Sequence, residues 1–167
     1  MDLEQNKYSS VEYDEYILGS AQAVGLMCLQ IFTAGNREAY EHLKMSAMKL
    51  GSAFQKVNFL RDAQADYKTL DRTYFPEVDL TAFSNDEKKK IENDIEHDFA
   101  EALVGIKQLP VSARSGVYLA YVYYRQLFNK IKRTSADTVL SARIRISNFQ
   151  KIGLMCDSLI RYKLNVL

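Results

Sequence analysis

The sequence predicts an all-α fold, and its composition and its residue pattern both indicate this. Only two prolines and seven glycines occur among 167 residues, which leaves few sites for the tight turns of a strand-rich protein. No segment alternates apolar and polar residues between hairpin turns, whereas apolar residues recur at helical spacing along much of the chain. There is no repeat and no break in composition, so residues 1–167 are expected to form a single helical domain.

The first half of the chain is expected to contain three helices. Residues 11–33 are apolar at helical spacing, with small residues clustered in the middle of the segment. A polar turn at 35–36 precedes a short helix at 37–44, and a longer helix follows from about 46 to 67. The proline-containing segment 68–83 is expected to be an irregular loop.

The second half opens on "SNDE", a capping box with Ser84 as the N-cap and Glu87 three residues later. It begins a charged helix that ends before Pro110, and its run at 85–98 is expected to face solvent. The later elements are expected to be a tyrosine-rich helix at 112–132, a short helix at 135–142, an extended "RIRIS" segment and a last helix from about 148.

Charge and cysteine content limit the class of protein. The formal net charge is +1, from 22 basic and 21 acidic residues, so no nucleic-acid partner is expected. Cys28 and Cys156 form no CxxC pair and no disulfide framework, which is typical of a reducing compartment. The N-terminus has no apolar signal-peptide core, and no uncharged apolar run is expected to span a membrane. A cytoplasmic protein is therefore expected.

The stretch "GSAFQKVNFLRDAQADY" at 51–67 places polar side chains along one stripe of an otherwise apolar helix. At about 100° per residue, its polar positions fall within about 80° of arc. From the spacing alone, an exposed surface and the wall of a cavity are equally compatible with this stripe. Carboxylates four residues apart, with amide side chains one and two turns earlier, suit Mg²⁺ bound to a diphosphate. The stripe consists of Gly51, Gln55, Asn58, Asp62 and Asp66.

This stretch resembles the second aspartate-rich motif of the squalene and phytoene synthases, G-x-A-x-Q-x-x-N-x-x-R-D-x-x-x-D, at every specified position. Three further segments resemble the same family in the same order: "YILGSAQAVGLM" at 16–27, "DRTYFP" at 71–76 and "YYRQLFNKI" at 123–131. In the second of these, Asp71 replaces the glycine of the family pattern. Together the segments span most of the chain, from residue 16 to residue 131, and their residues are most similar to those of bacterial phytoene synthases.

The resemblance implies a helical bundle of the isoprenoid synthase type. It also implies the head-to-head condensation of two prenyl diphosphates, two geranylgeranyl diphosphates giving phytoene, in carotenoid biosynthesis. The implied cofactor is Mg²⁺, with Mn²⁺ as an alternative. Family members carry a first aspartate-rich motif upstream of the segment that 16–27 resembles, and this sequence lacks it. The chain is therefore expected to correspond to the C-terminal part of such an enzyme, without its N-terminal helices, and to be inactive alone.

The resemblance also implies roles for individual residues. Asp62, Asp66 and Asn58 would bind the metal, and Tyr16 and Tyr124 would stabilise a carbocation, although tyrosine clusters are equally typical of a protein core. The substrate would contact Gln55, Asn58, Arg61, Gly51, Val24 and Gly25.

Several alternatives stay open at this point. A squalene or hydroxysqualene type of synthase would use farnesyl diphosphate, and a non-catalytic member of the superfamily would be a helical assembly or binding module. Besides a prenyl diphosphate, the partners considered are a membrane surface that receives the product and a second copy bound through the apolar face of 11–33. Arg143 and Arg145 could bind a diphosphate, while the flanking Ile144 and Ile146 favour an ordinary half-buried segment.

Overall fold

The structure, a computed structural model, describes residues 8–70, 74–76, 78 and 83–164, without the side chains of 66–70 and of Lys163. This part of the chain is helical and contains no strand, which confirms the all-α prediction. Its elements are α1 (Ser10–Ile17), the π-helical segment η1 (Leu18–Gln22), α2 (Ala23–Phe32), α3 (Arg37–Leu70), α4 (Asn85–Gln108), α5 (Val111–Lys132), α6 (Ala136–Ser141) and α7 (Asn148–Lys163).

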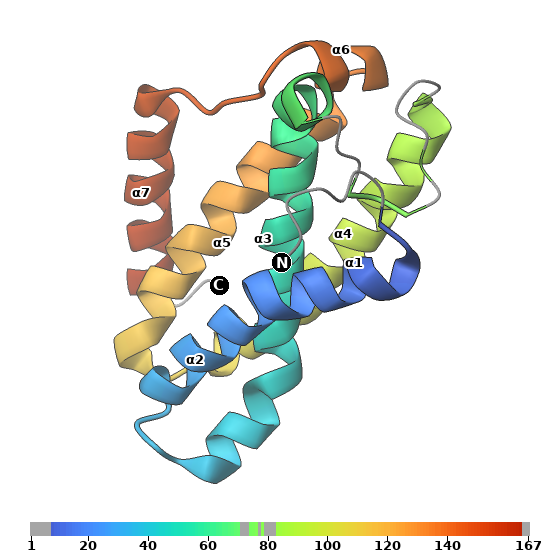
Figure 1. Cartoon of the computed structure of the whole chain (residues 1–167). Coiled ribbons are helices and arrows are strands. Elements are labelled where there is room, and N and C mark those ends of the chain that lie inside the picture. The colour runs from blue at the N-terminus through green and yellow to red at the C-terminus, as the bar shows by residue number, and fades with distance from the viewer. Residues whose placement is uncertain (1–7, 71–73, 77, 79–82, 165–167) are drawn as a thin grey trace.

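The long helix α3 runs through the centre of the bundle (Figure 1). It packs against α1, η1, α2, α4, α5 and α6, whereas α7 packs on the outer side of α5. The main core lies between α3, α4 and α5, and its largest fully buried side chains include Phe99, Phe128, Leu60 and Ile95. Helices from both halves of the chain thus surround α3, which carries the aspartate-rich stretch.

The two helices predicted at 37–44 and 46–67 are one continuous helix, so the predicted break is wrong. Neither glycine nor proline interrupts the residues between them, and a helix propagates unless such a residue stops it. The turn before this helix was predicted correctly, since Gly35 has a left-handed backbone, with φ of +80°. The side chain of Asn36 then accepts a hydrogen bond from the backbone N–H of Ala39, at 3.0 Å, and caps the helix.

Capping boxes begin three of the helices. The box predicted at Ser84 and Glu87 is present at the start of α4. The same reciprocal bonds join Ser9 to Glu12 before α1 and Ser147 to Gln150 before α7. These two boxes were readable in the sequence as S-x-x-E and S-x-x-Q, and they fix helix starts that the periodicity of the apolar residues leaves uncertain by a residue or two.

The expectation that the charged run 85–98 faces solvent is wrong for one side of α4. Lys88, Glu92 and Asp98 are buried there. Lys88 pairs with Glu92 one turn away, while Asp98 accepts hydrogen bonds from Lys49 at 2.9 Å and Lys56 at 2.6 Å, both on α3. Buried charges persist only where partners compensate them: Lys88 and Glu92 compensate each other, and α3 supplies the partners of Asp98.

Glu96 joins α4 to α5 and is expected to make stability depend on pH. Burial alone would raise the pKa of its carboxyl, but hydrogen bonds from Arg125 at 2.6 Å and Lys132 at 3.2 Å outweigh it and lower the pKa below its usual value of 4.5. A carboxyl with a lowered folded-state pKa stabilises the fold above the unfolded value, and that contribution is lost as pH falls through the folded value.

We therefore expect the free energy of unfolding to fall as pH drops below 4.5, with Glu96 contributing at most about 1 kcal/mol because the pair is partly exposed. Urea unfolding at a series of acidic pH values, for the natural chain and for Glu96→Gln, measures this contribution. The variant should show a shallower pH dependence. Identical dependence in the two proteins would contradict the assignment.

One helical stretch, Ser10–Phe32, is long and apolar enough to cross a membrane by length and composition. This corrects the expectation that no apolar run reaches that length, although core helices of soluble proteins pass the same test. Only 17% of its most apolar window is buried, and Met27 and Ile31 are well exposed. The exposed apolar face foreseen on 11–33 is thus present. Self-association through it, contact with a membrane and the cytoplasmic location stay predictions.

Candidate functional site

An apolar cavity of about 620 Å³ lies between η1, α2, α3, α4 and α5. Each helix contributes small residues to its wall, so the helices approach one another without filling the space between them. Four of the residues predicted to contact substrate line this cavity: Val24 and Gly25 from α2, and Gly51 and Gln55 from α3. A volume of this size is typical of a site for a small organic ligand.

Polar side chains gather where α3 and α5 leave the cavity. Phe54 and Gln55 belong to the wall, and the ring of Tyr124 stacks on Phe54 with 3.9 Å between centroids. The Tyr124 hydroxyl donates a hydrogen bond to Oδ1 of Asn58 at 3.3 Å. Tyr124 and Asn58, predicted separately from α5 and α3, are therefore brought together at this end.

Asp62 lies one turn beyond Asn58 and carries two arginine partners. Arg61 donates to both of its carboxylate oxygens, and Nε of Arg143 lies 2.7 Å from Oδ1. The hydrogen bond to Asp62 is the largest cause that raises the pKa of Arg61, against the lowering effect of burial. One carboxylate facing two guanidinium groups leaves positive charge at this end of the site. Guanidinium groups bind phosphate through paired hydrogen bonds, so the cluster is suited to an anionic ligand.

Two of the three residues predicted to bind Mg²⁺, Asp62 and Asn58, lie at this end of the cavity. Among the side chains that the structure describes, no three from His, Cys, Asp and Glu come together as a metal-binding group. Asp66 lies on α3, but its side chain is outside the described part of the chain. The described oxygen donors at this end are the Asp62 carboxylate and the amide of Asn58. Mg²⁺ is commonly held by one or two carboxylates together with substrate phosphates and water, and these donors match that set.

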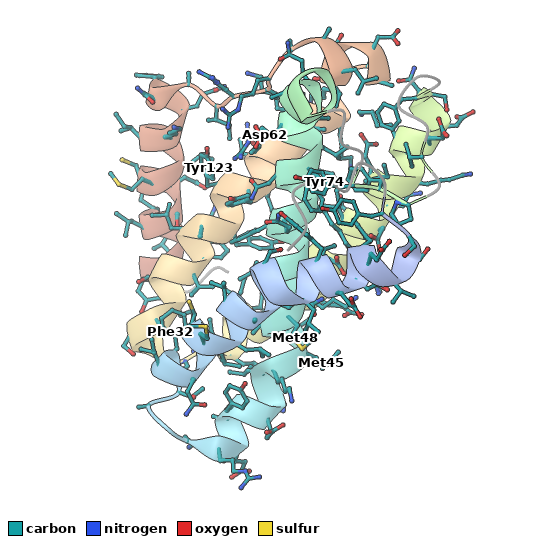
Figure 2. The ribbon with its side chains drawn as sticks, viewed as in Figure 1. Phe32, Met45, Met48, Asp62, Tyr74 and Tyr123 are labelled. Atoms are coloured by element: carbon teal, nitrogen blue, oxygen red, sulfur yellow. The ribbon has the colours of Figure 1, made fainter. Side chains whose placement is uncertain are left out.

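Tyr16 lies apart from the cavity wall. Its ring packs against Phe59 at 5.7 Å and Tyr74 at 5.4 Å between centroids, and Tyr74 itself stacks on Phe59 at 4.1 Å (Figure 2). The described contacts thus place Tyr16 in an aromatic cluster between α1, α3 and the loop after α3. They do not join it to Tyr124. Of the loop that resembles the family pattern, Asp71 and Arg72 lie outside the described residues.

Two glycines predicted to contact substrate also set the spacing of the helices. A Cβ atom on Gly51 would lie 2.6 Å from the backbone oxygen of Ala21, and one on Gly25 would lie 2.8 Å from that of Ala47. No side chain fits at either place without moving a backbone. The two glycines of the segment 11–33 therefore differ: Gly25 packs closely against α3, whereas Gly19 has open space around it.

Sequence reasoning missed part of the wall and left Arg143 undecided. Ile144 and Ile146 are buried and Arg143 is exposed, as in a half-buried segment, yet Arg143 also reaches Asp62. The wall on α5 was missed, although its signal was present as small residues at four-residue spacing. These are Ser112, Gly116 and Ala120.

Residues 1–150 match the family model described as squalene/phytoene synthase. The chain belongs to this family. Its members join prenyl units head to head, and the helical bundle and the order of motifs agree with that membership. Within the family, the chain is 28% identical over 192 aligned positions to the phytoene synthase of Arthrospira platensis, covering 100% of this chain and 61% of that protein.

A second relative in the squalene/phytoene synthase family is the 15-cis-phytoene synthase of Synechococcus elongatus. It is 27% identical over 185 positions, covering 96% of this chain and 59% of that protein. The chain thus spans about three fifths of the length of the curated relatives that it matches.

Proposed function

We propose that this chain binds the diphosphate and the tail of a prenyl diphosphate in a phytoene synthase type of transferase, which condenses two geranylgeranyl diphosphates to phytoene. One observation carries the proposal: the apolar cavity ends at a polar cluster in which Asn58, Asp62 and Tyr124 come from two different helices. An apolar chain with a diphosphate at one end has the same division into apolar and anionic parts. Membership of the family supports this assignment.

The positive groups of the cluster would bind the diphosphate. Arg61 and Arg143 both bond to Asp62, which balances part of their charge. A diphosphate arriving at this end would offer them several further acceptor oxygens. Gln55 and Asn58, two turns and one turn before Asp62, would donate amide hydrogen bonds to the same oxygens.

Asp62, Asp66 and Asn58 would hold Mg²⁺, or Mn²⁺ in its place. When bound, the ion supplies positive charge to the leaving diphosphate. In the proposed reaction the allylic C–O bond would break with its electron pair leaving on the diphosphate, and an allylic cation would remain beside the cavity. The stacked rings of Phe54 and Tyr124 lie at this point, and an aromatic face stabilises a cation by about 0.5–2 kcal/mol. The apolar wall would keep water from the cation.

The test is a chimera in which residues 1–167 replace the matching part of the Arthrospira platensis phytoene synthase. With geranylgeranyl diphosphate and Mg²⁺ it is expected to form phytoene, measured by chromatography of the extracted product. Asp62→Asn in the chimera should lower Mg²⁺-dependent turnover on the order of a hundredfold or more, because even groups that only orient metal ligands are worth 10–100-fold.

Asp157→Asn is the matched control, since Asp157 lies on α7 and pairs only locally with Arg161, at 2.8 Å. It should leave turnover unchanged. An active chimera whose turnover survives Asp62→Asn would refute the assignment of Asp62, provided that circular dichroism shows equal helix content in the two proteins.

A non-catalytic binding module is a second candidate, favoured by one observation. The Asp62 carboxylate is already engaged by two arginines, as in a purely structural ion pair. A folded chimera that binds a geranylgeranyl thiodiphosphate analogue but forms no phytoene, under conditions in which the parent enzyme does, would support this candidate.

A further inference from the structure

We propose that the cavity measures the length of the prenyl tail, and that a floor made by Leu29, Leu43 and Leu109 limits it to about four isoprene units. The inference rests on the proposed function only in placing the diphosphate at the Asp62 end. The three leucines form a separate buried cluster, with Phe32 packed against it, and all four line the cavity. Figure 2 shows Phe32 at the far end of α2, away from Asp62.

The pairing of η1 and α2 with α3 explains why the cavity is open in the middle and closed at this floor. Gly51 approaches Ala21, and Gly25, four residues after Ala21, approaches Ala47, four residues before Gly51. The next step of four residues along both helices brings Leu29 to Leu43. The first two contacts involve only glycine and alanine, which leave space for the cavity. At the third contact the two leucine side chains fill that space.

The depth of the cavity corresponds to a particular tail length. Asn58 and Leu43 are 15 residues apart on α3, which is about 22 Å of helix. An extended isoprene unit adds four carbon–carbon bonds of about 1.5 Å and so about 5 Å of length. Four units then reach about 20 Å and end against the leucines, whereas three units would leave about 7 Å of apolar wall uncovered. Covering that wall favours the longer tail.

Two residues of α5 line the cavity at different distances from Tyr124, so a larger side chain at each would block the cavity at a different depth. Gly116 lies eight residues before Tyr124, about 12 Å, and Ala113 lies eleven residues before it, about 16 Å. Both line the cavity, and a Cβ atom on Gly116 would meet nothing within 4 Å. Ala113→Leu should therefore obstruct only the fourth unit, and Gly116→Leu the third and fourth. Gly153 on α7 has equally open surroundings outside the cavity, so Gly153→Leu is the matched control.

Free prenyl alcohols test the tail site without a diphosphate or a metal. Binding of geraniol, farnesol, geranylgeraniol and geranylfarnesol to the 167-residue chain would be measured by calorimetry. We expect affinity to rise about tenfold or more with each unit up to geranylgeraniol, and not to rise further with the fifth unit. Ala113→Leu should weaken geranylgeraniol about tenfold while farnesol is unchanged. Gly116→Leu should weaken both, and Gly153→Leu neither.

The floor itself is tested by Leu43→Ala, which should let geranylfarnesol bind more tightly than geranylgeraniol. Circular dichroism establishes that the variant is folded, and the two α5 variants test the same idea if it is not. Equal affinity of the natural chain for farnesol and geranylgeraniol would overturn the proposal, as would an equal loss of both in Ala113→Leu. Because no diphosphate takes part, these results are independent of the fate of Asp62→Asn in the chimera.

Discussion

Replacing Asp98 with alanine is expected to lower the free energy of unfolding by about 3 kcal/mol. Asp98 is fully buried and accepts hydrogen bonds from Lys49 and from Lys56, whose side chain is only 10% exposed. Removing one partner of a buried ion pair leaves the other charge uncompensated, which costs about 3–5 kcal/mol. The lower end applies here because Lys56 keeps Asp94, at 2.5 Å, as a second partner.

Urea unfolding followed by far-UV circular dichroism measures this change. Asn93→Ala, at an exposed position on the same helix, is the control and should change stability by no more than about 0.5 kcal/mol. Adding Lys56→Met to Asp98→Ala should restore part of the loss, because the uncompensated charge is then gone. A double variant less stable than the sum of its single changes would contradict this electrostatic explanation.

Gly51→Ala is expected to destabilise the protein, although the same change usually stabilises a helix. Alanine is favoured over glycine in a helix interior by about 1 kcal/mol. At Gly51, however, the added Cβ would lie 2.6 Å from the backbone oxygen of Ala21 and 2.9 Å from its carbonyl carbon. Because both contacts are with backbone, η1 must move away from α3. Such overpacking typically costs 1–3 kcal/mol, and after the gain of about 1 kcal/mol in helix propensity a net loss of up to about 2 kcal/mol is expected.

Gly153→Ala provides the opposite case, since its Cβ would meet nothing within 4 Å. It should stabilise the chain by up to about 1 kcal/mol. Both variants can be compared by thermal and urea unfolding. If Gly51→Ala proved as stabilising as Gly153→Ala, then η1 would not be held against α3 as closely as described.

Local features of the fold were readable from the sequence because they depend on neighbouring residues. Ser84 and Glu87 define a helix start within one turn, and Gly35 defines the turn before α3. The continuity of α3 was predictable on the same grounds, because neither glycine nor proline lies between the two helices predicted at 37–44 and 46–67. The burial of Asp98 could not be read from its own segment, since its partners Lys49 and Lys56 lie more than 40 residues earlier.

Part of the candidate site could likewise be predicted from residues within one helix, whereas other parts depend on contacts between helices. The stripe from Gly51 to Asp62 follows from helical spacing within one element, and the structure places its first two members, Gly51 and Gln55, on the cavity wall. The bond from Tyr124 to Asn58 and that from Arg143 to Asp62 depend on how α5 and the segment before α7 pack on α3. No local pattern encodes that packing. The depth of the cavity likewise depends on the registration of helices, which becomes visible only once they are assembled.

The π-helical turn η1 makes the number of residues in this part of the chain as important as their identity. Its backbone bond from Ala23 to the carbonyl of Leu18 spans five residues, one more than in an α-helix. If the same residues formed a regular α-helix instead, the extra residue would rotate α1 by about 100° relative to α2. Tyr13 would then leave Phe59, while Leu29 kept its place by Leu43. Relatives in which this stretch is a regular α-helix are therefore expected to be one residue shorter here.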